Sequence, residues 1–182
     1  HFNDPKIAFV ASRQTFITNQ NDFNHDHLFY EHIQSGKNAD KAAISCGSGV
    51  IYRRAALKEL GGFAEWSLVE DLYTSYLLNA AGWKSVYVSQ AYVRGFAPLD
   101  IAAVYKQRKT WAVDTLRIFI WDNPLLKHGL SFRQRIHYFE LAWSYVISGI
   151  FVPLIFTINI LSLFLNEQIV DNGAGYILLR AP

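Results

Sequence analysis

Sulfur is nearly absent from this sequence, which has one cysteine, Cys46, and no methionine among its 182 residues. A single cysteine excludes a disulfide framework within the chain and any Cys-x-x-Cys metal site. The chain also begins at His1, without an initiator methionine. We therefore expect an interior piece of a longer protein, with no signal peptide to interpret.

Charged residues are scarce as well, at 18% of the chain, and the net charge is only +2. So small an excess gives no reason to expect a nucleic-acid partner. Histidines gather at positions 25, 27 and 32, but they lack a rigid ligand pattern such as His-Glu-x-x-His and do not predict a metal site. With 51% apolar and 15% aromatic residues, the sequence predicts a packed fold rather than a disordered one.

Charge is missing altogether from residues 141–165. A bilayer core needs roughly 20 apolar residues, so this run is long enough to cross it. A buried core helix is the alternative, but core helices seldom extend this far without a charge. We expect a transmembrane helix over residues 139–166.

The charges that flank this helix predict its orientation. Basic residues precede it and acidic residues follow it: Lys127, Arg133 and Arg135, then Glu167 and Asp171. By the positive-inside rule, residues 1–138 then face the cytoplasm, and the protein is integral to the plasma or inner membrane. Residues 167–182 are expected to form an extracytoplasmic turn and the start of a second, truncated span.

Segments typical of strands and helices alternate in the cytoplasmic part, which predicts an α/β fold. We expect residues 1–98 to form one domain and residues 99–138 to form amphipathic helices at the membrane interface. Strands are predicted at 6–11, within 44–52 after a glycine-containing turn, and at 83–88, with a loop over 13–25. Helices are predicted at 26–34, 53–60, 72–81 and 99–121.

The adjacent acids Glu70 and Asp71 stand at the start of a predicted helix. Acidic side chains at this position commonly cap free N–H groups and favour the positive end of the helix dipole. A carboxylate can also remove a proton from an incoming hydroxyl group. The spacing alone leaves both interpretations open.

A second polar group lies within the predicted helix 99–121. At helical spacing Lys106, Gln107, Thr110 and Trp111 share one face. That face would offer an amide, a cation and an indole to a diphosphate and a sugar ring. A basic amphipathic helix on a membrane surface would contain the same residues, so the pattern is not specific by itself.

Several short motifs follow one another along the chain. They are Cys46-Gly47-Ser48, Arg53-Arg54-x-x-Leu57, Gly61-Gly62-Phe63, Val69-Glu70-Asp71, Gly82-Trp83, Gln107-x-x-x-Trp111, Asn123-Pro124-Leu125-Leu126 and Gln134-Arg135. In this order they resemble the motifs of the membrane-embedded, processive family-2 glycosyltransferases of the cellulose synthase type. The resemblance covers nearly the whole chain, and the ordered set is far more specific than any single motif.

The resemblance implies a nucleotide-sugar transferase fold of the GT-A type, of which residues 1–98 would be the C-terminal half. It implies inverting transfer of a sugar, glucose in the leading hypothesis, from a UDP-sugar to the non-reducing end of a growing β-glycan that is exported across the bilayer. An accessory membrane subunit is a further possible partner. The family's divalent cation, Mg²⁺ or Mn²⁺, would have its ligands before His1, so no metal ligand is expected in this chain.

The resemblance also implies roles for individual residues. Asp71 matches the last position of the family's T-E-D motif, the general base that deprotonates the acceptor hydroxyl group. The residues that it assigns to the acceptor glycan are Cys46, Gly47, Glu70, Trp111 and Tyr30, with Phe29 beside Tyr30. It assigns Gln107 to the donor diphosphate, and we expect Arg108, Lys106 and Thr110 to lie at the same group.

Two positions depart from the family's motifs. Val69 replaces the threonine of T-E-D, and Thr110 replaces the arginine of Q-x-x-R-W. A threonine hydroxyl has no charge to offer a leaving diphosphate. Lys106, one helical turn before Thr110, is expected to supply that charge better than Arg108, which is rotated by roughly 200° from Thr110.

Two other functions remain open at this point. One is non-processive transfer of a sugar to a lipid, against which Trp111 argues, because that tryptophan belongs to polymerising members. The other is a non-catalytic scaffold, which only Thr110 supports.

Overall fold

The computed structural model describes residues 1–17 and 28–165. The chain divides into two compact units, His1–Trp143 and Ser144–Pro182, which are described separately. The expected division at residues 98, 138 and 166 stays a prediction, and its last segment, 167–182, lies outside the described residues.

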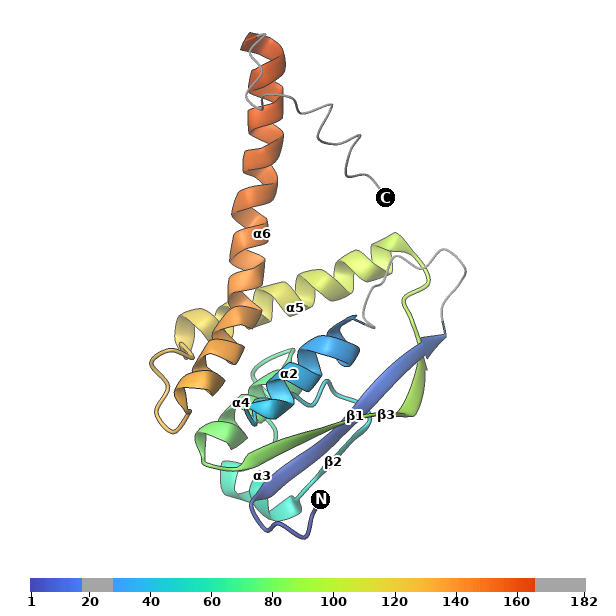
Figure 1. Cartoon of the computed structure of the whole chain (residues 1–182), viewed down its shortest axis with the longest axis vertical. Coiled ribbons are helices and arrows are strands. Elements are labelled where there is room, and N and C mark those ends of the chain that lie inside the picture. The colour runs from blue at the N-terminus through green and yellow to red at the C-terminus, as the bar shows by residue number, and fades with distance from the viewer. Residues whose placement is uncertain (18–27, 166–182) are drawn as a thin grey trace. The chain divides into compact units, whose positions relative to one another are not determined.

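The first unit contains a three-stranded sheet in the order β2-β1-β3 (Figure 1). The central strand β1 (Ile7–Ile17) pairs antiparallel with β2 (Val50–Tyr52) and parallel with β3 (Lys84–Phe96). Ile7, Ala8 and Phe9 are buried, as expected for the central strand of a covered sheet. The predicted α/β class is confirmed.

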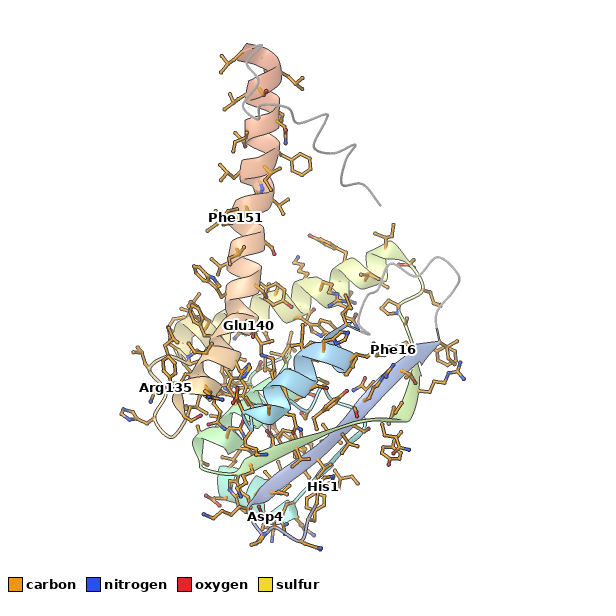
Figure 2. The ribbon with its side chains drawn as sticks, viewed as in Figure 1. His1, Asp4, Phe16, Arg135, Glu140 and Phe151 are labelled. Carbon is orange, nitrogen blue, oxygen red and sulfur yellow. The ribbon has the colours of Figure 1, made fainter. Side chains whose placement is uncertain are left out.

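The predicted loop over 13–25 is wrong for its first residues, because β1 extends to Ile17. Residues 13–17 pair with the second half of β3, from Gln14 opposite Val93 to Ile17 opposite Phe96. Phe16 is labelled in this part of β1 in Figure 2. The pairing partner lies some 80 residues away in sequence, so no local pattern indicated the extension. Residues 18–25 lie outside the described residues.

The helices follow the predicted ranges closely, with one exception. Within the helix predicted at 26–34, residues 26 and 27 lie outside the described residues, and the rest forms a π-helical turn, η1 (Phe29–Ile33), that continues as α2 (Gln34–Ala39) through Gly36 and Asn38, where an end was expected. The other helices are α3 (Arg54–Leu60), α4 (Glu70–Ala80), α5 (Ile101–Trp121) and α6 (Phe132–Leu165). Local signals bound several of them: α3 ends at Gly61, which has φ +84°, and Asp100 caps α5 by accepting from Ala103 N at 2.7 Å.

Two clusters of buried side chains form the core of the first unit. The first lies at the sheet and includes Phe9, Leu78 and Tyr87. The second joins the loop before α4, α4 itself, α5 and the first turns of α6, through Val69, Tyr73, Tyr76, Ile118 and Tyr138. Cys46 and Trp111 both pack against this second cluster, so two motifs that are 65 positions apart meet at one core.

Charged side chains bond α2 to the first turns of α6. Lys37, 1% exposed, donates to the His137 carbonyl at 2.7 Å and to the Glu140 carboxylate at 3.4 Å. Asp40 accepts from Arg133 Nη1 at 2.9 Å, and its other oxygen lies 2.9 Å from His137 Nε2. Burial lowers the pKa of Lys37, although Glu140, labelled in Figure 2, opposes that shift. We call these five residues the α2–α6 cluster.

From Ser144 onward α6 belongs to the second unit. Its side chains there are largely exposed, Phe151 (Figure 2) and Leu163 among them. Among the described residues, α6 is the one helix that is long and apolar enough to cross a membrane. It contains the described part of the span predicted at 139–166.

Candidate active site

Asp71 lies in the first turn of α4 and is half-buried, whereas its neighbour Glu70 is exposed. One carboxylate oxygen, Oδ1, accepts from the backbone N–H of Leu72 at 2.7 Å. The residue that precedes the helix, Val69, has no side-chain cap. Asp71 therefore satisfies one N–H group of the first turn, while its Oδ2 points elsewhere.

Burial raises the pKa of Asp71, and the nearby carboxylate of Glu70 adds to the shift. Both effects disfavour the charged form of the group. A carboxylate with a raised pKa is a stronger proton acceptor when it is ionised, which is the property that general base catalysis requires. Burial also raises the pKa of Tyr52 to about 12, and the charge of Asp71 contributes, so Tyr52 stays protonated beside this carboxylate at neutral pH.

The loop 45–49 runs past the free side of Asp71. A Cβ atom at Gly47 would lie 3.3 Å from Asp71 Oδ2, so the bare glycine leaves room at the carboxylate. Gly47 has φ +75° and Cys46 has φ +56°, a left-handed conformation that costs a side chain about 1–2 kcal/mol. The structure thus brings Cys46 and Gly47, assigned to the acceptor glycan, to the predicted general base.

Two buried glutamines hold this loop in place. Gln14 of β1 donates from Nε2 to the carbonyl groups of Cys46 and Ser48 at 3.0 and 2.9 Å. Gln34 of α2 donates to the Ile44 carbonyl at 2.6 Å and to Cys46 Sγ at 3.3 Å, and it accepts from Ile44 N at 3.1 Å. These bonds hold residues 44–48 against two elements at once. Sequence reasoning missed both glutamines, because each stands beside other polar residues, Arg13 and Thr15 or Ser35, and nothing in the sequence indicates that it is buried.

Serine hydroxyl groups connect the same loop to the backbone of Asp71. Ser45 Oγ donates to the Asp71 carbonyl at 3.1 Å, and Ser75 Oγ donates to that carbonyl at 2.7 Å. Ser75 Oγ also accepts from Ser45 N at 3.1 Å. The loop and the first turn of α4 therefore form one hydrogen-bonded assembly.

The α5 residues that were predicted to face the donor contact one another along the helix. The guanidinium carbon of Arg108 lies 4.8 Å from the centroid of the Trp111 ring, a cation–π contact between residues three positions apart. Thr110 Oγ1 donates to the Lys106 carbonyl at 3.1 Å, and the Lys106 side chain is exposed. Arg108 thus contacts Trp111, and the donor-diphosphate roles of Lys106, Gln107, Arg108 and Thr110 stay predictions.

Gln107 and Tyr30 have contrasting environments. Gln107 Oε1 is buried and accepts no hydrogen bond from any described residue, which leaves an acceptor available to a ligand. Tyr30 is 8% exposed and belongs to the first core cluster, where its ring contacts Phe16 and Phe29 at centroid distances of 6.0 and 5.2 Å. Its contact with a glycan stays a prediction, as does that of Phe29.

The divalent cation implied by the resemblance has no evident site here. Within residues 1–17 and 28–165, no group of three or more histidine, cysteine, aspartate or glutamate side chains could hold a metal ion. The described side chains therefore do not fit a metal centre.

Comparison with known proteins agrees with the motifs. The sequence profile described as glycosyl transferase family group 2 matches residues 3–174. A cellulose synthase catalytic subunit [UDP-forming] of Pseudomonas fluorescens (strain SBW25) is 36% identical over 145 residues, which are 74% of this chain and 20% of that protein. Cellulose synthase 2 of Novacetimonas hansenii is 32% identical over 189 residues, 98% of this chain and 12% of that protein.

Cellulose synthase 1 of Komagataeibacter xylinus is also 32% identical, over 154 residues, which are 79% of this chain and 10% of that protein. The chain therefore spans only about a tenth to a fifth of the length of these curated relatives.

Proposed function

From the premise that this chain belongs to glycosyl transferase family group 2, we propose that it forms the acceptor side of a processive, inverting glycosyltransferase. The donor is a UDP-sugar, with glucose as the sugar, and the acceptor is the non-reducing end of a β-glycan. The names of the relatives, which are cellulose synthases and one UDP-forming catalytic subunit, support this choice of donor and polymer. The enzyme class, a glycosyltransferase, follows from the family.

In the proposed reaction Asp71 accepts the proton of the acceptor hydroxyl group. The freed oxygen attacks the anomeric carbon of the donor, the bond from that carbon to the diphosphate breaks, and UDP leaves with the electron pair. The new glycosidic bond forms on the opposite face, which inverts the configuration. The observation that carries this proposal is the half-buried Asp71 carboxylate, whose pKa is raised and whose Oδ2 faces Gly47. Cys46, Gly47 and Glu70 would line the path of the acceptor.

On α5, Trp111 would contact the sugar at the end of the acceptor glycan, and Gln107 would contact the diphosphate of the donor. The amide NH₂ group of Gln107 would donate to the diphosphate oxygens, whereas its unpartnered Oε1 can only accept, as from a hydroxyl group of a sugar. Arg108, whose guanidinium contacts Trp111, would supply the charge that Thr110 lacks, and Lys106 is the alternative cation. The metal ion that assists family members with the diphosphate would be held by residues elsewhere in the complete protein.

The proposed location is the membrane, with residues 1–138 in the cytoplasm and α6 as the first span after the catalytic domain. The length and apolar composition of α6 support the span. The basic residues before it support the orientation. The complete protein would export the glycan through the membrane, with or without an accessory subunit.

The test is Asp71→Asn in the complete polypeptide, with Glu70→Gln as the matched control. Asparagine keeps the shape of the side chain and can accept from Leu72 N, but it cannot take a proton at neutral pH. We expect UDP release from UDP-glucose to fall by roughly 10²–10⁴-fold, the usual contribution of general base catalysis. Glu70→Gln, which changes the adjacent exposed acid, should cost much less. Synthesis near the wild-type rate in Asp71→Asn would leave Asp71 with the capping role alone.

A further inference from the structure

Asp114 is a carboxylate buried in α5, and none of the motifs includes it. Only 1% of its surface is exposed, and it lies three positions after Trp111. A buried charge is costly unless its oxygens are paired. One oxygen, Oδ1, accepts from Arg117 Nη1 at 2.9 Å, one turn further along the same helix.

The other oxygen of Asp114 reaches a different element. Asp114 Oδ2 accepts from the backbone N–H of Leu68, in the turn that leads into α4. The Leu68 side chain is 72% exposed, so packing of this side chain does not hold its own backbone in place. Leu68 is three residues before Asp71. The bond to Asp114 therefore connects the helix of Trp111 to the segment that places the candidate general base.

Aromatic and polar contacts also connect the C-terminal half of α5 to α4 and the loop before it. The Arg117 guanidinium lies 5.4 Å from the centroid of Trp66, whose ring meets Tyr73 edge to face at 4.9 Å. The Tyr73 hydroxyl group donates to Asp122 Oδ2 at 2.9 Å, at the C-terminal end of α5. We call Asp114, Arg117, Trp66, Tyr73 and Asp122 the α4–α5 brace. Asp114 is the member nearest in sequence to Trp111.

We propose that Asp114 is a positioning residue that sets the place of Asp71 relative to Trp111. This proposal rests on the proposed function of Asp71 as the general base. Two oxygens are needed, because each accepts from a different donor. An asparagine has one acceptor oxygen and an NH₂ group, so one of the two donors would face another donor. The loop before α4 would then shift, and Asp71 would shift with it.

The main variant is Asp114→Asn in the complete polypeptide, measured by steady-state UDP release. We expect kcat to fall roughly 10- to 100-fold, because a displacement approaching 1 Å of a reacting group costs that much. The KM for UDP-glucose should change less than twofold, since donor contacts on α5 are kept. Hydrogen exchange at residues 67–71 should become faster, while exchange in the second half of α4 stays slow.

Asp40→Asn is the matched control. Asp40 also has two partners, Arg133 and His137, but it contacts neither α4 nor α5 through these bonds. This variant should lose stability without the fall in kcat, because Lys37 still bonds α2 to α6 and Gln34 still holds the loop 45–49. An equal fall in kcat in both variants, or an unchanged kcat in Asp114→Asn, overturns the positioning role.

A second variant keeps the test decisive if Asp114→Asn does not fold. Arg117 is half-exposed, and Arg117→Gln removes both its ion pair with Asp114 and its cation–π contact with Trp66, while the bond from Leu68 N to Asp114 is kept. We expect a fall in kcat of several-fold with KM unchanged, and an unaltered kcat would count against the proposal. Failure of the proposed function is measured separately. Activity in Asp71→Asn would refute the role of Asp71 as the general base. The hydrogen-exchange rates at residues 67–71 would still show whether Asp114 holds the segment before α4.

Discussion

Gly47 offers the sharpest test of how closely the loop 45–49 approaches the candidate base. Its φ is +75°, and a Cβ added there would lie 3.3 Å from Asp71 Oδ2. Gly47→Ala therefore has two effects. The left-handed conformation costs the alanine about 1–2 kcal/mol, and the methyl group pushes the carboxylate away by a few tenths of an ångström.

Gly61 separates these two effects. It has φ +84° at the end of α3, but a Cβ there meets nothing within 4 Å. Gly61→Ala should thus lower the free energy of unfolding by the same 1–2 kcal/mol without disturbing Asp71. Because 1 Å of misplacement costs about 10²-fold, a displacement of a few tenths should lower kcat roughly tenfold in Gly47→Ala and not in Gly61→Ala.

The assay measures UDP release and denaturant unfolding for both variants in the complete polypeptide. Gly47→Ala should lose more kcat than Gly61→Ala at matched loss of stability. If the two variants show the same kcat, the loop does not constrain Asp71 and the placement of the acceptor beside Gly47 is wrong.

Two further predictions follow from the charges of the site. The folded chain binds the Asp71 proton more tightly than the unfolded chain, because burial raises the pKa of this group. The free energy of unfolding should therefore rise as the pH falls from above the raised pKa to the ordinary value of 3.8. Asp71→Asn should remove this pH dependence and stabilise the fold at neutral pH, and unfolding curves measured over a pH series test both effects. The same pH dependence in the variant and the wild type would contradict the prediction. On α5, Arg108→Ala should weaken UDP binding by about 1.5–3 kcal/mol, as for a lost charge-assisted hydrogen bond, whereas Lys106→Ala should change it little. Calorimetric titration with UDP measures both affinities. A larger loss in Lys106→Ala than in Arg108→Ala would make Lys106 the cation at the diphosphate.

Local signals were enough to predict much of this fold. The glycine after α3 and the acidic pair at the start of α4 indicated helix ends within two residues of those found. The extension of β1 to Ile17 was not predictable in the same way, because its partner is the second half of β3 and a strand is defined by pairing as much as by its own residues.

In the candidate site too, residues in short motifs were predictable and residues defined by distant partners were not. Asp71 and Trp111 could be singled out because they belong to recognisable motifs. Gln14, Gln34 and Asp114 could not, since a polar residue on a buried face gives no indication of its partner until the chain is folded. Helical rotation from Thr110 ranks Lys106 before Arg108, but it gives no information on the contact between Arg108 and Trp111, which depends on the length of the arginine side chain.

Helix α2 is bonded at its beginning to the loop 45–49 and at its end to α6. Gln34 holds Cys46, while Lys37 and Asp40 belong to the α2–α6 cluster. Six residues of helix separate Gln34 from Asp40, a rise of about 9 Å. A helix this short does not bend easily, so a movement of the first turns of α6 displaces the loop beside Asp71 by a similar amount unless these bonds break. The first turns of α6 and the backbone next to Asp71 are therefore connected through one short helix.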